Sequence, residues 1–314
     1  MTYRILTLDG GGIRGLVATV FLQRLCDEPG LNGWLDKVDF IAGTSTGALI
    51  ALGIAEGLAL ATIQDVYVHK GPKIFDDSWL DNVRDLGNLI GAQYDTDTLK
   101  KVVDQLFNVT TLGELRKVVL IPTFDLDNYD PANRNEPRRW KPKLFHNVRN
   151  LNNDAAEIVA SVALRACAAP TYFPSVDGYI DGGVYANNPS MCALAQTQEI
   201  GTDGQRMASI DDIVMLSLGS GTNLEYIKGN SKDWGLSQWV KPLINLMNDG
   251  TVDIARYQCA QMLGERFHRL APYFPPGSAV KLDGATDREI EYLVKFADEE
   301  DIGPCADWLR ENWT

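Results

Sequence analysis

The chain has 314 residues, with 29 Lys and Arg against 42 Asp and Glu, which gives a formal net charge of −13 at pH 7. Hydrophobic residues make up 45% and charged residues 23%, ordinary values that exclude a disordered, fibrous or low-complexity chain. The acidic balance argues against nucleic acid as a partner and against electrostatic docking on anionic lipid. It does not exclude an uncharged apolar ligand.

Cysteine and histidine usage adds two constraints. Five scattered cysteines without a Cys-x-x-Cys pair are typical of free thiols in a reducing compartment. The first residues lack the basic and apolar regions of a signal peptide, and no apolar run is long enough to span a membrane. We therefore expect a cytoplasmic protein, with secretion by a signal-independent route still open. Only three histidines are present, which limits general-base chemistry.

The first third of the chain alternates short apolar runs with helical periodicity. Residues 3–8 are predicted to form a strand that ends at a glycine turn, and residues 13–27 a helix that stops before Pro29-Gly30. Residues 38–42 repeat the pattern, with a second glycine turn at 43–47 and an Ala-rich helix after it. This alternation predicts right-handed crossovers and a mostly parallel sheet.

The later elements are expected from similar patterns. We predict helices at 60–70, 98–107, 155–166 and 189–199, strands at 117–124, 144–148 and 213–218, and a polar loop at 128–142. Residues 234–314 look mostly helical apart from a Pro/Gly loop at 272–277. No internal repeat and no clear linker divides the chain.

Ser45 lies in a Gly-x-Ser-x-Gly pattern between a predicted strand and a predicted helix. The flanking glycines, Gly43 and Gly47, allow a turn tight enough to expose the serine hydroxyl. The N-terminus of the following helix points at the serine, where it favours a developing negative charge. The pattern indicates a nucleophile; the alternative is a glycine-rich turn whose serine only caps the helix.

A second glycine turn, Asp9 to Gly15, follows the first strand and reads DGGGIRG. Consecutive glycines let backbone N–H groups converge on an anion. A dinucleotide-phosphate site is one alternative, but it requires an acidic residue at the end of a second strand, whereas Asp36 and Asp39 precede or begin that strand. Because adjacent parallel strands open at one sheet edge, we expect this loop to face Ser45 as an oxyanion hole.

A serine nucleophile needs a base, and the sequence offers two arrangements. A triad would use His146 or His268, but both, like His69, lie away from any glycine turn. A Ser–Asp dyad would use Asp181, which follows a short strand and opens the turn Gly182–Gly183. A free aspartate, with a pKa of about 3.9, is a weak base and must lie within about 3 Å of the hydroxyl. The alternative for Asp181 is a residue that only closes the turn.

Taken together, three motifs resemble those of the patatin-like phospholipases. They are the glycine loop DGGGIRG, the elbow GTSTG at 43–47 and the DGG at 181–183, in the same order and spacing. The third motif is DGG where DGA is equally familiar in the family, and both forms keep the aspartate and the turn. Shorter similarities are AAPTYF, ANNP and LSLGSG at residues 168–173, 186–189 and 216–221. The resemblance covers about residues 1 to 225.

This resemblance implies a three-layer α/β/α fold around a mostly parallel central sheet, with extra C-terminal helices. It implies Ser45 as the nucleophile and Asp181 as the base. It places an oxyanion hole in the glycine loop, with the N–H groups of Gly11 and Gly12 as donors. The remaining expected site residues are Gly10 and Arg14 in that loop, with Arg14 steadying it, and the turn glycines Gly15, Gly43, Gly47, Gly182 and Gly183.

The resemblance also implies an activity and a division of the chain. We expect a lipid acyl hydrolase of phospholipase A or lysophospholipase type that needs no metal or other cofactor. A lipid or lysophospholipid would be its substrate, and contact with a membrane surface would be transient. Residues 1–225 would form the catalytic domain and residues 226–314 a mostly helical extension packed on it. Apolar segments at 86–92, 243–247 and 271–279 are candidates for an acyl groove or a membrane-facing lip, or else ordinary core or loop.

Two other functions stay open at this point. The same serine could serve a histidine-dependent esterase or an acyltransferase. The chain could also be a storage or partner-binding protein in which catalysis is incidental. The head group, the position of the cleaved acyl chain and the oligomeric state are not determined by the sequence.

Overall fold

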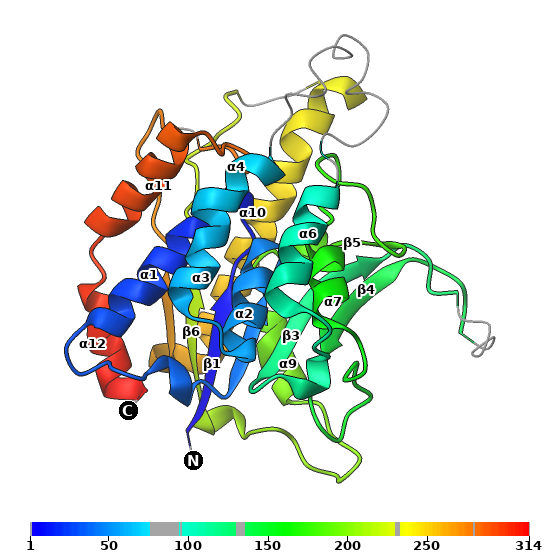
Figure 1. Cartoon of the computed structure of the whole chain (residues 1–314), viewed down its shortest axis with the longest axis vertical. Helices are drawn as coiled ribbons and strands as arrows, with labels where there is room; N and C mark the ends of the chain where they lie inside the picture. Colours follow the sequence, from blue (N-terminus) through cyan, green and yellow to red (C-terminus); the bar gives the residue numbers. More distant parts are fainter. Residues whose placement is uncertain are drawn as a thin grey trace.

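A twisted sheet runs through the centre of the molecule (Figure 1). The computed structural model describes residues 2–75, 94, 96–129, 136–229, 233–278 and 280–313. Within these residues the sheet has seven strands in the order β4-β3-β2-β1-β6-β7, with β5 paired to β3. The strands are β1 (Tyr3–Leu8), β2 (Phe40–Gly43), β3 (Val118–Asp125), β4 (Lys141–His146), β5 (Tyr179–Asp181), β6 (Ile213–Leu218) and β7 (Phe267–Leu270).

The central strands are parallel and apolar, as buried parallel strands usually are. β1 pairs in parallel with β2 and β6, β2 with β3, and β6 with β7. Only β4 and β5 run antiparallel, both against β3. The sheet is therefore mostly parallel, as the sequence predicts, with an antiparallel edge. The carboxyl ends of β1 and β2 lie next to each other, with Leu8 paired to Gly43.

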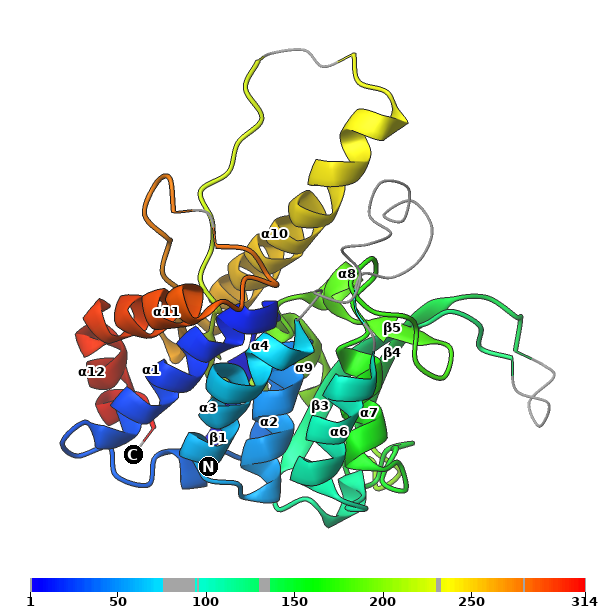
Figure 2. The same cartoon turned by 45° about the horizontal axis from the view of Figure 1, so that its top comes forward.

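Helices cover both faces of the sheet (Figures 1 and 2). The helices that pack together with α1 and α2 fill one face, and α9 and α10 pack on the other. The described helices are α1 (Gly15–Asp27), α2 (Thr46–Glu56), α3 (Leu60–Asp65), α4 (Gly71–Ile74), α6 (Thr96–Phe107), α7 (Val159–Ala166), α8 (Gly183–Ala186), α9 (Ser190–Thr197), α10 (Leu236–Leu263), α11 (Asp287–Glu299) and α12 (Gly303–Asn312). Short 3-10 turns are η1 (Gly12–Arg14), η2 (Leu35–Lys37), η4 (Leu112–Glu114), η5 (Ile210–Asp212) and η6 (Gly264–Arg266), and the π-helix η3 covers Val66–Lys70.

Two hydrophobic clusters show why the sheet has two covered faces. Along β1, Leu6 and Leu8 belong to the larger cluster, whereas Ile5 belongs to the smaller one. This alternation follows from the two-residue period of a strand. Ala193 of α9 and Cys259 of α10 complete the smaller cluster, so residues from both the middle and the end of the chain build the second layer.

The predicted fold class is confirmed: the chain is an α/β protein with a central sheet between helices. The sequence missed one strand, β7, because its pattern FHRL lacks an apolar run and lies in a region that looked helical. Within the described part of the chain, no helix is both long enough and apolar enough to cross a membrane.

The candidate lipid-contact segments have different outcomes. Residues 86–92 lie outside the described residues. In the segment 271–279, Phe274 is buried against Phe296 of α11, so that aromatic ring belongs to the core. The segment 243–247 lies on α10, and its last residue, Met247, lines the main pocket described below.

Candidate active site

Ser45 occupies a sharp turn between β2 and α2. Its φ of 55° and ψ of −126° place a non-glycine residue in a sparsely populated backbone region. Such a conformation costs of order 1–3 kcal/mol and persists only where the surrounding structure holds it. The turn sets Ser45 immediately before the first residue of α2, at the positive end of the helix dipole.

The two glycines of the elbow are required by close backbone approaches. A Cβ on Gly43 would collide with the carbonyl group of Gly47, and a Cβ on Gly47 would collide with the carbonyl oxygens of Leu8 and Asp9. The elbow therefore packs closely on the end of β1, and neither of its glycines has room for a side chain. Thr44 fixes the elbow further, since its N–H donates to the Leu8 carbonyl oxygen at 3.1 Å.

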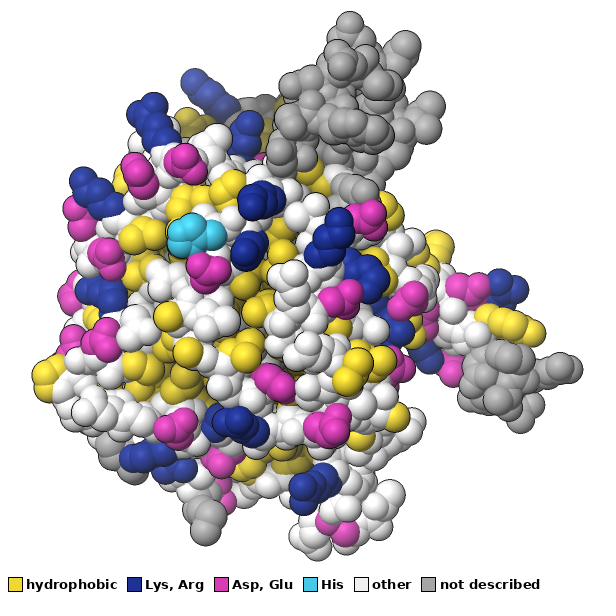
Figure 3. All heavy atoms as spheres, viewed as in Figure 1, with side chains coloured by type: hydrophobic (Ala, Val, Ile, Leu, Met, Phe, Trp, Pro, Cys, Tyr) yellow, Lys and Arg dark blue, Asp and Glu magenta, His cyan; other side chains and the backbone are white. Residues whose placement is uncertain are grey.

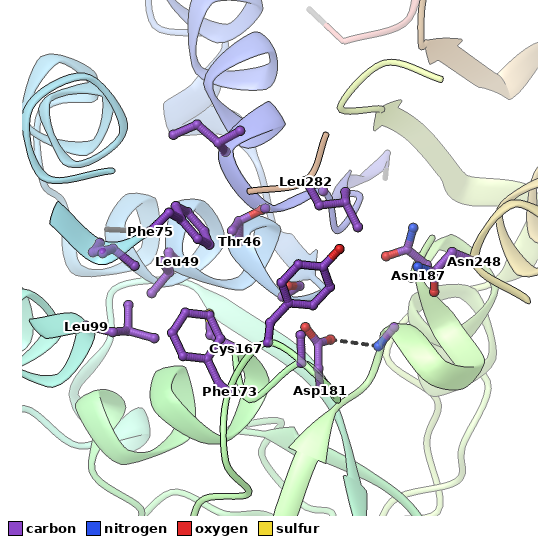
Figure 4. A pocket seen from close by; sticks show the side chains of 18 of the residues that line it. Thr46, Leu49, Phe75, Leu99, Cys167, Phe173, Asp181, Asn187, Asn248 and Leu282 are labelled. Atoms are coloured by element: carbon purple, nitrogen blue, oxygen red, sulfur yellow. Dashed lines mark hydrogen bonds between the residues drawn. The ribbon is translucent and has the colours of Figure 1, made fainter. Parts of the chain in front are cut away.

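Asp181 ends the short strand β5 and is 4% exposed. The Gly183 N–H donates to its Oδ1 at 2.8 Å, an interaction drawn in Figure 4, so the turn itself orients the carboxylate. Gly182 packs its Cα against the Pro122 carbonyl of β3, where a Cβ would collide. The DGG sequence therefore allows a buried carboxylate to sit directly on the sheet.

The Ser45 hydroxyl lies close enough to the Asp181 carboxylate to lower its pKa, and both residues line the same pocket. Burial raises the pKa of Asp181 to about 6, and the neighbouring Ser45 hydroxyl and the Gly183 N–H offset part of this effect. A carboxyl group with a pKa near 6 is a much better proton acceptor than a free aspartate, and it is still ionised at neutral pH.

The glycine loop after β1 approaches the same serine. A Cβ on Gly10 would collide with the Asn187 Oδ1 and stand 3.2 Å from the Ser45 Cβ, so a side chain there would displace Asn187. Among the described residues, the N–H groups of Gly11 and Gly12 have no acceptor, and both glycines line the pocket that contains Ser45. Gly10 differs from the expectation, because its N–H already donates to the Asn187 carbonyl oxygen at 2.9 Å. Arg14 contacts the loop through a weak 3.4 Å bond from its Nε to the Gly11 carbonyl oxygen.

Residues from the C-terminal third of the chain hold this loop. The Arg269 guanidinium of β7 forms a two-point buried ion pair with Asp9, at 2.5 and 3.2 Å. Burial raises the pKa of Asp9, and the Arg269 charge offsets part of that rise. The Ser220 hydroxyl donates to the Gly10 carbonyl oxygen at 2.9 Å. The Leu282 carbonyl oxygen accepts the Ile13 N–H at 2.8 Å.

A deep pocket opens beside Ser45 and Asp181. It holds about 1130 Å³ of space, including open solvent at its mouth. Figure 4 shows Leu49, Phe75, Leu99 and Phe173 on one side of Asp181. These side chains come from α2, from the end of α4, from α6 and from the loop after α7, and they make this side of the pocket apolar.

The other side of the pocket is more polar. Asn187 and Asn248 lie there, across Asp181 from the apolar side chains (Figure 4). Met247 and Asn248 come from α10, and Leu282 comes from the segment before α11. The pocket is thus largely apolar, with two asparagines across Asp181 from the apolar side chains, which suits an ester with a long tail and a polar leaving group.

The three histidines and the cysteines stand apart from this chemistry. His69 pairs with Asp65 on the surface, His146 is buried at the end of β4, and His268 stacks on Trp308. None of the three lines the pocket. All five cysteines are free, and burial raises the pKa of the Cys167 thiol beside Asp181 well above its usual value. Among the described residues no group of three or more His, Cys, Asp or Glu could hold a metal ion.

Sequence motifs locate Ser45, Asp181 and the glycine loop, and the structure places all of them at one sheet edge. The roles of Arg269, Leu282 and Asn248 were not foreseen, because no motif surrounds them and their partners lie far away in the chain. Asn187 and Ser220 do fall in the short similarities ANNP and LSLGSG. That signal marked the positions without indicating that they contact the glycine loop.

The fold and the site define an α/β/α carboxylic ester hydrolase. Residues 6–194 match the model of the patatin-like phospholipase family, and the chain belongs to that family. Patatin-like protein 2 of Arabidopsis thaliana is 30% identical over 94% of this chain and 82% of its own length. A cGAMP-activated phospholipase of Pseudomonas aeruginosa is 28% identical over 86% of this chain and 78% of its own length. The chain is a lipid acyl hydrolase of this family.

Among solved structures, VipD from Legionella pneumophila aligns with 95% of this chain and 67% of its own chain. The TM-score is 0.45 and the sequence identity is 12%.

Proposed function

We propose that this protein hydrolyses fatty acyl esters of phospholipids or lysophospholipids through a Ser45–Asp181 dyad and an acyl-serine intermediate. The observation that carries the proposal is a serine in a strained elbow beside a buried carboxylate with a raised pKa, both lining one largely apolar pocket. The family match to patatin-like phospholipases supports the same class of substrate.

In the first half of the reaction, Asp181 accepts the Ser45 proton as Oγ attacks the ester carbonyl carbon. The carbonyl oxygen becomes an oxyanion, which the N–H groups of Gly11 and Gly12 bind, with help from the α2 dipole. When the intermediate collapses, the carbon–oxygen bond to the alcohol breaks. The leaving oxygen takes the proton from Asp181, and the acyl group stays on Ser45.

In the second half, water replaces the alcohol. Asp181 accepts a proton from the water as its oxygen attacks the acyl carbon. The second oxyanion uses the same two N–H groups, and its collapse returns the proton to Ser45 and releases the fatty acid. Each step uses only groups that this chain supplies.

Product analysis across a lipid panel tests this proposal. Ser45→Ala and Asp181→Asn are expected to lower kcat by about 10⁴-fold or more while the fold is kept. Removing one oxyanion N–H donor is expected to cost about 3 kcal/mol, but backbone groups cannot be removed by substitution. A Ser45→Ala variant with near-normal lipid hydrolysis would refute the dyad.

The alternatives have their own discriminating measurements. A triad enzyme would lose as much activity in His146→Ala or His268→Ala as in Ser45→Ala, whereas the dyad predicts retained activity in both. An acyltransferase would yield more acylated acceptor than free fatty acid. A binding protein with incidental catalysis would leave Ser45 unlabelled by a fluorophosphonate probe.

The cysteines and the charge of the protein bear on its compartment and on its contact with membranes. Five free cysteines support a reducing compartment such as the cytoplasm. The net charge of −13 and the interspersed charges on the face in Figure 3 give no basic patch there to attract anionic lipid. We therefore infer that contact with a membrane surface is brief and does not depend on charge.

A further inference from the structure

Helix α10 carries an apolar stripe on the side that faces away from the protein. A surface helix normally turns polar residues outward and apolar residues toward the core. Ala255, Cys259 and Leu263 form the buried face of α10, which packs on α8, α9 and β7. The stripe consists of Leu243, Leu246, Met247, Ile254 and Tyr257.

The position of the stripe follows from helical geometry. Each residue turns the helix by about 100°, so positions 243, 246, 247, 254 and 257 fall opposite positions 255, 259 and 263. The five stripe residues are 43–58% exposed, and no described residue buries them. At about 1.5 Å per residue the stripe extends for about 21 Å along the helix.

The stripe is continuous with the entrance of the active-site pocket. Met247 belongs to both, since it is exposed and also lines the pocket, and the next residue, Asn248, lines the same pocket. Figure 2 shows that this end of α10 projects beyond the body of the protein. Tyr226, which is 84% exposed, precedes the helix, and Trp234 packs on Trp239 near its start. Aromatic rings with one polar group suit the boundary between water and lipid.

Charges near the stripe select the kind of surface. Asp249 and Asp253 lie on the adjacent side of α10, where Arg256 pairs with Asp253 at 3.6 Å and Glu225 lies near Asp249. Such carboxylates repel anionic lipid head groups. An apolar stripe beside carboxylates therefore fits a lipid surface without net charge. The hydrophobic effect would drive the stripe side chains into that surface.

We propose that the stripe of α10 docks the enzyme on a zwitterionic phospholipid bilayer and brings the pocket entrance to the lipid. This inference rests on the proposed lipid hydrolysis, because the stripe matters only where the substrate lies in a bilayer. Docking at Met247 shortens the path of an acyl chain from the bilayer into the pocket. A second copy of the chain is the competing occupant of the stripe.

The test separates docking from chemistry. The double variant L243S/L246S removes two stripe residues that do not line the pocket. In an inactive Ser45→Ala background, flotation with phosphatidylcholine vesicles is expected to show binding weakened about 10-fold or more. In the active enzyme, vesicle hydrolysis is expected to fall by a similar factor, whereas hydrolysis of the soluble ester p-nitrophenyl butyrate stays at the wild-type rate.

A matched control changes two exposed apolar residues at the opposite sheet edge. Val109 precedes β3 and Ile200 precedes β6, and both are more than half exposed. V109S/I200S is expected to keep vesicle binding and both activities. Raising the ionic strength from about 0.1 M to about 1 M is expected to leave wild-type vesicle binding unchanged or stronger.

Three results would overturn the inference. One is wild-type vesicle binding by L243S/L246S. Another is an equal loss of soluble-ester hydrolysis, which would place the effect in the pocket or the fold. The third is a wild-type dimer in sedimentation velocity that becomes a monomer in L243S/L246S, which would assign the stripe to a second copy. Failure of the proposed function itself shows separately, as absent soluble-ester and lipid hydrolysis by the wild type.

Discussion

Asp181 is the residue at which stability and chemistry conflict most directly. A carboxylate buried on a sheet is costly, and here the Gly183 N–H donates to it and the Ser45 hydroxyl lies beside it. The same burial that costs free energy raises the pKa to about 6 and turns an ordinary aspartate into an effective base. The site thus exchanges stability for reactivity at one side chain.

This conflict predicts the pH dependence of the reaction. Asp181 must be ionised to accept the Ser45 proton, so log kcat/KM on a soluble ester should fall with a slope of one below about pH 6. Above that pH, and up to mild alkaline conditions, it should be level. A profile that falls only below pH 4 would mean that the base has an ordinary carboxyl pKa.

Asp181 also predicts how stability depends on pH: as pH rises, activity should increase but the free energy of unfolding should decrease. The folded pKa of about 6 exceeds the ordinary value of 3.8, so the folded state binds more protons between these values and stability falls as pH rises through them. The full difference is about 3 kcal/mol at pH 7.5. Asp181→Asn should therefore be inactive and more stable than the wild type at pH 7.5, and the two should converge at pH 4 in urea unfolding. A destabilised Asn variant at pH 7.5 would contradict this.

Arg269 supports the glycine loop through its ion pair with Asp9, which lies 260 residues away in the sequence. Removing Arg269 leaves the buried Asp9 carboxyl without this ion pair, at the base of the glycine loop. Arg269→Ala should cost about 3–5 kcal/mol in urea unfolding and also lower kcat on a soluble ester. The control is Arg138→Ala, whose pair with Asp127 is exposed, where we expect less than about 1 kcal/mol and full activity. Equal effects in the two variants would show that the Asp9 pair has no special role.

At the scale of elements, the segment of residues 280–283 works as a strap over the glycine loop. Its Leu282 carbonyl accepts the Ile13 N–H, and its backbone at Val280 forms two hydrogen bonds with Asn223, at 3.0 and 3.1 Å. Gly12 has a φ of +58°, and a Cβ there would collide with the same Leu282 carbonyl. The strap therefore holds the Gly12–Ile13 peptide, which is adjacent to the peptide that carries the Gly12 N–H.

Loosening the strap should damage catalysis more than binding. Asn223→Ala removes both bonds to Val280 and should lower kcat about 10-fold or more, less than the loss of a whole oxyanion donor, with KM nearly unchanged. Ser278→Ala, in the exposed turn just before the strap, is the control and should have no effect. A pure KM effect in Asn223→Ala would assign the strap to substrate binding.

At the scale of the whole molecule, residues 226–314 contribute to the sheet, the second layer and the site. β7 extends the sheet beside β6, and Cys259 and Leu263 of α10 belong to the smaller hydrophobic cluster. Arg269 and Leu282 contact the glycine loop through Asp9 and Ile13. We therefore propose that residues 1–225 and 226–314 form one cooperative unit.

One cooperative unit predicts one unfolding transition. Calorimetry of the full chain should give a van't Hoff enthalpy equal to the calorimetric enthalpy, with esterase activity lost in that same transition. Two resolved transitions, the first of which spares activity, would show that the C-terminal part folds independently and is dispensable for the reaction.

The sequence by itself determined the elements whose physics is local. The alternation of apolar strands and amphipathic helices predicts the α/β class, and the glycines around Ser45 and Asp181 predict turns, because their spacing reflects backbone approaches that exclude a Cβ. These patterns also bring Ser45, Asp181 and the glycine loop to one sheet edge.

Only the tertiary structure decided which distant groups complete the site. Arg269 lies 260 residues from Asp9, and nothing in FHRL distinguishes it from a surface arginine. The availability of the Gly11 and Gly12 N–H groups, in contrast to Gly10, depends on where the Asn187 carbonyl falls. The pKa of Asp181 depends on its burial. Contacts across the fold and loss of solvent are properties of packing, which a linear pattern does not encode.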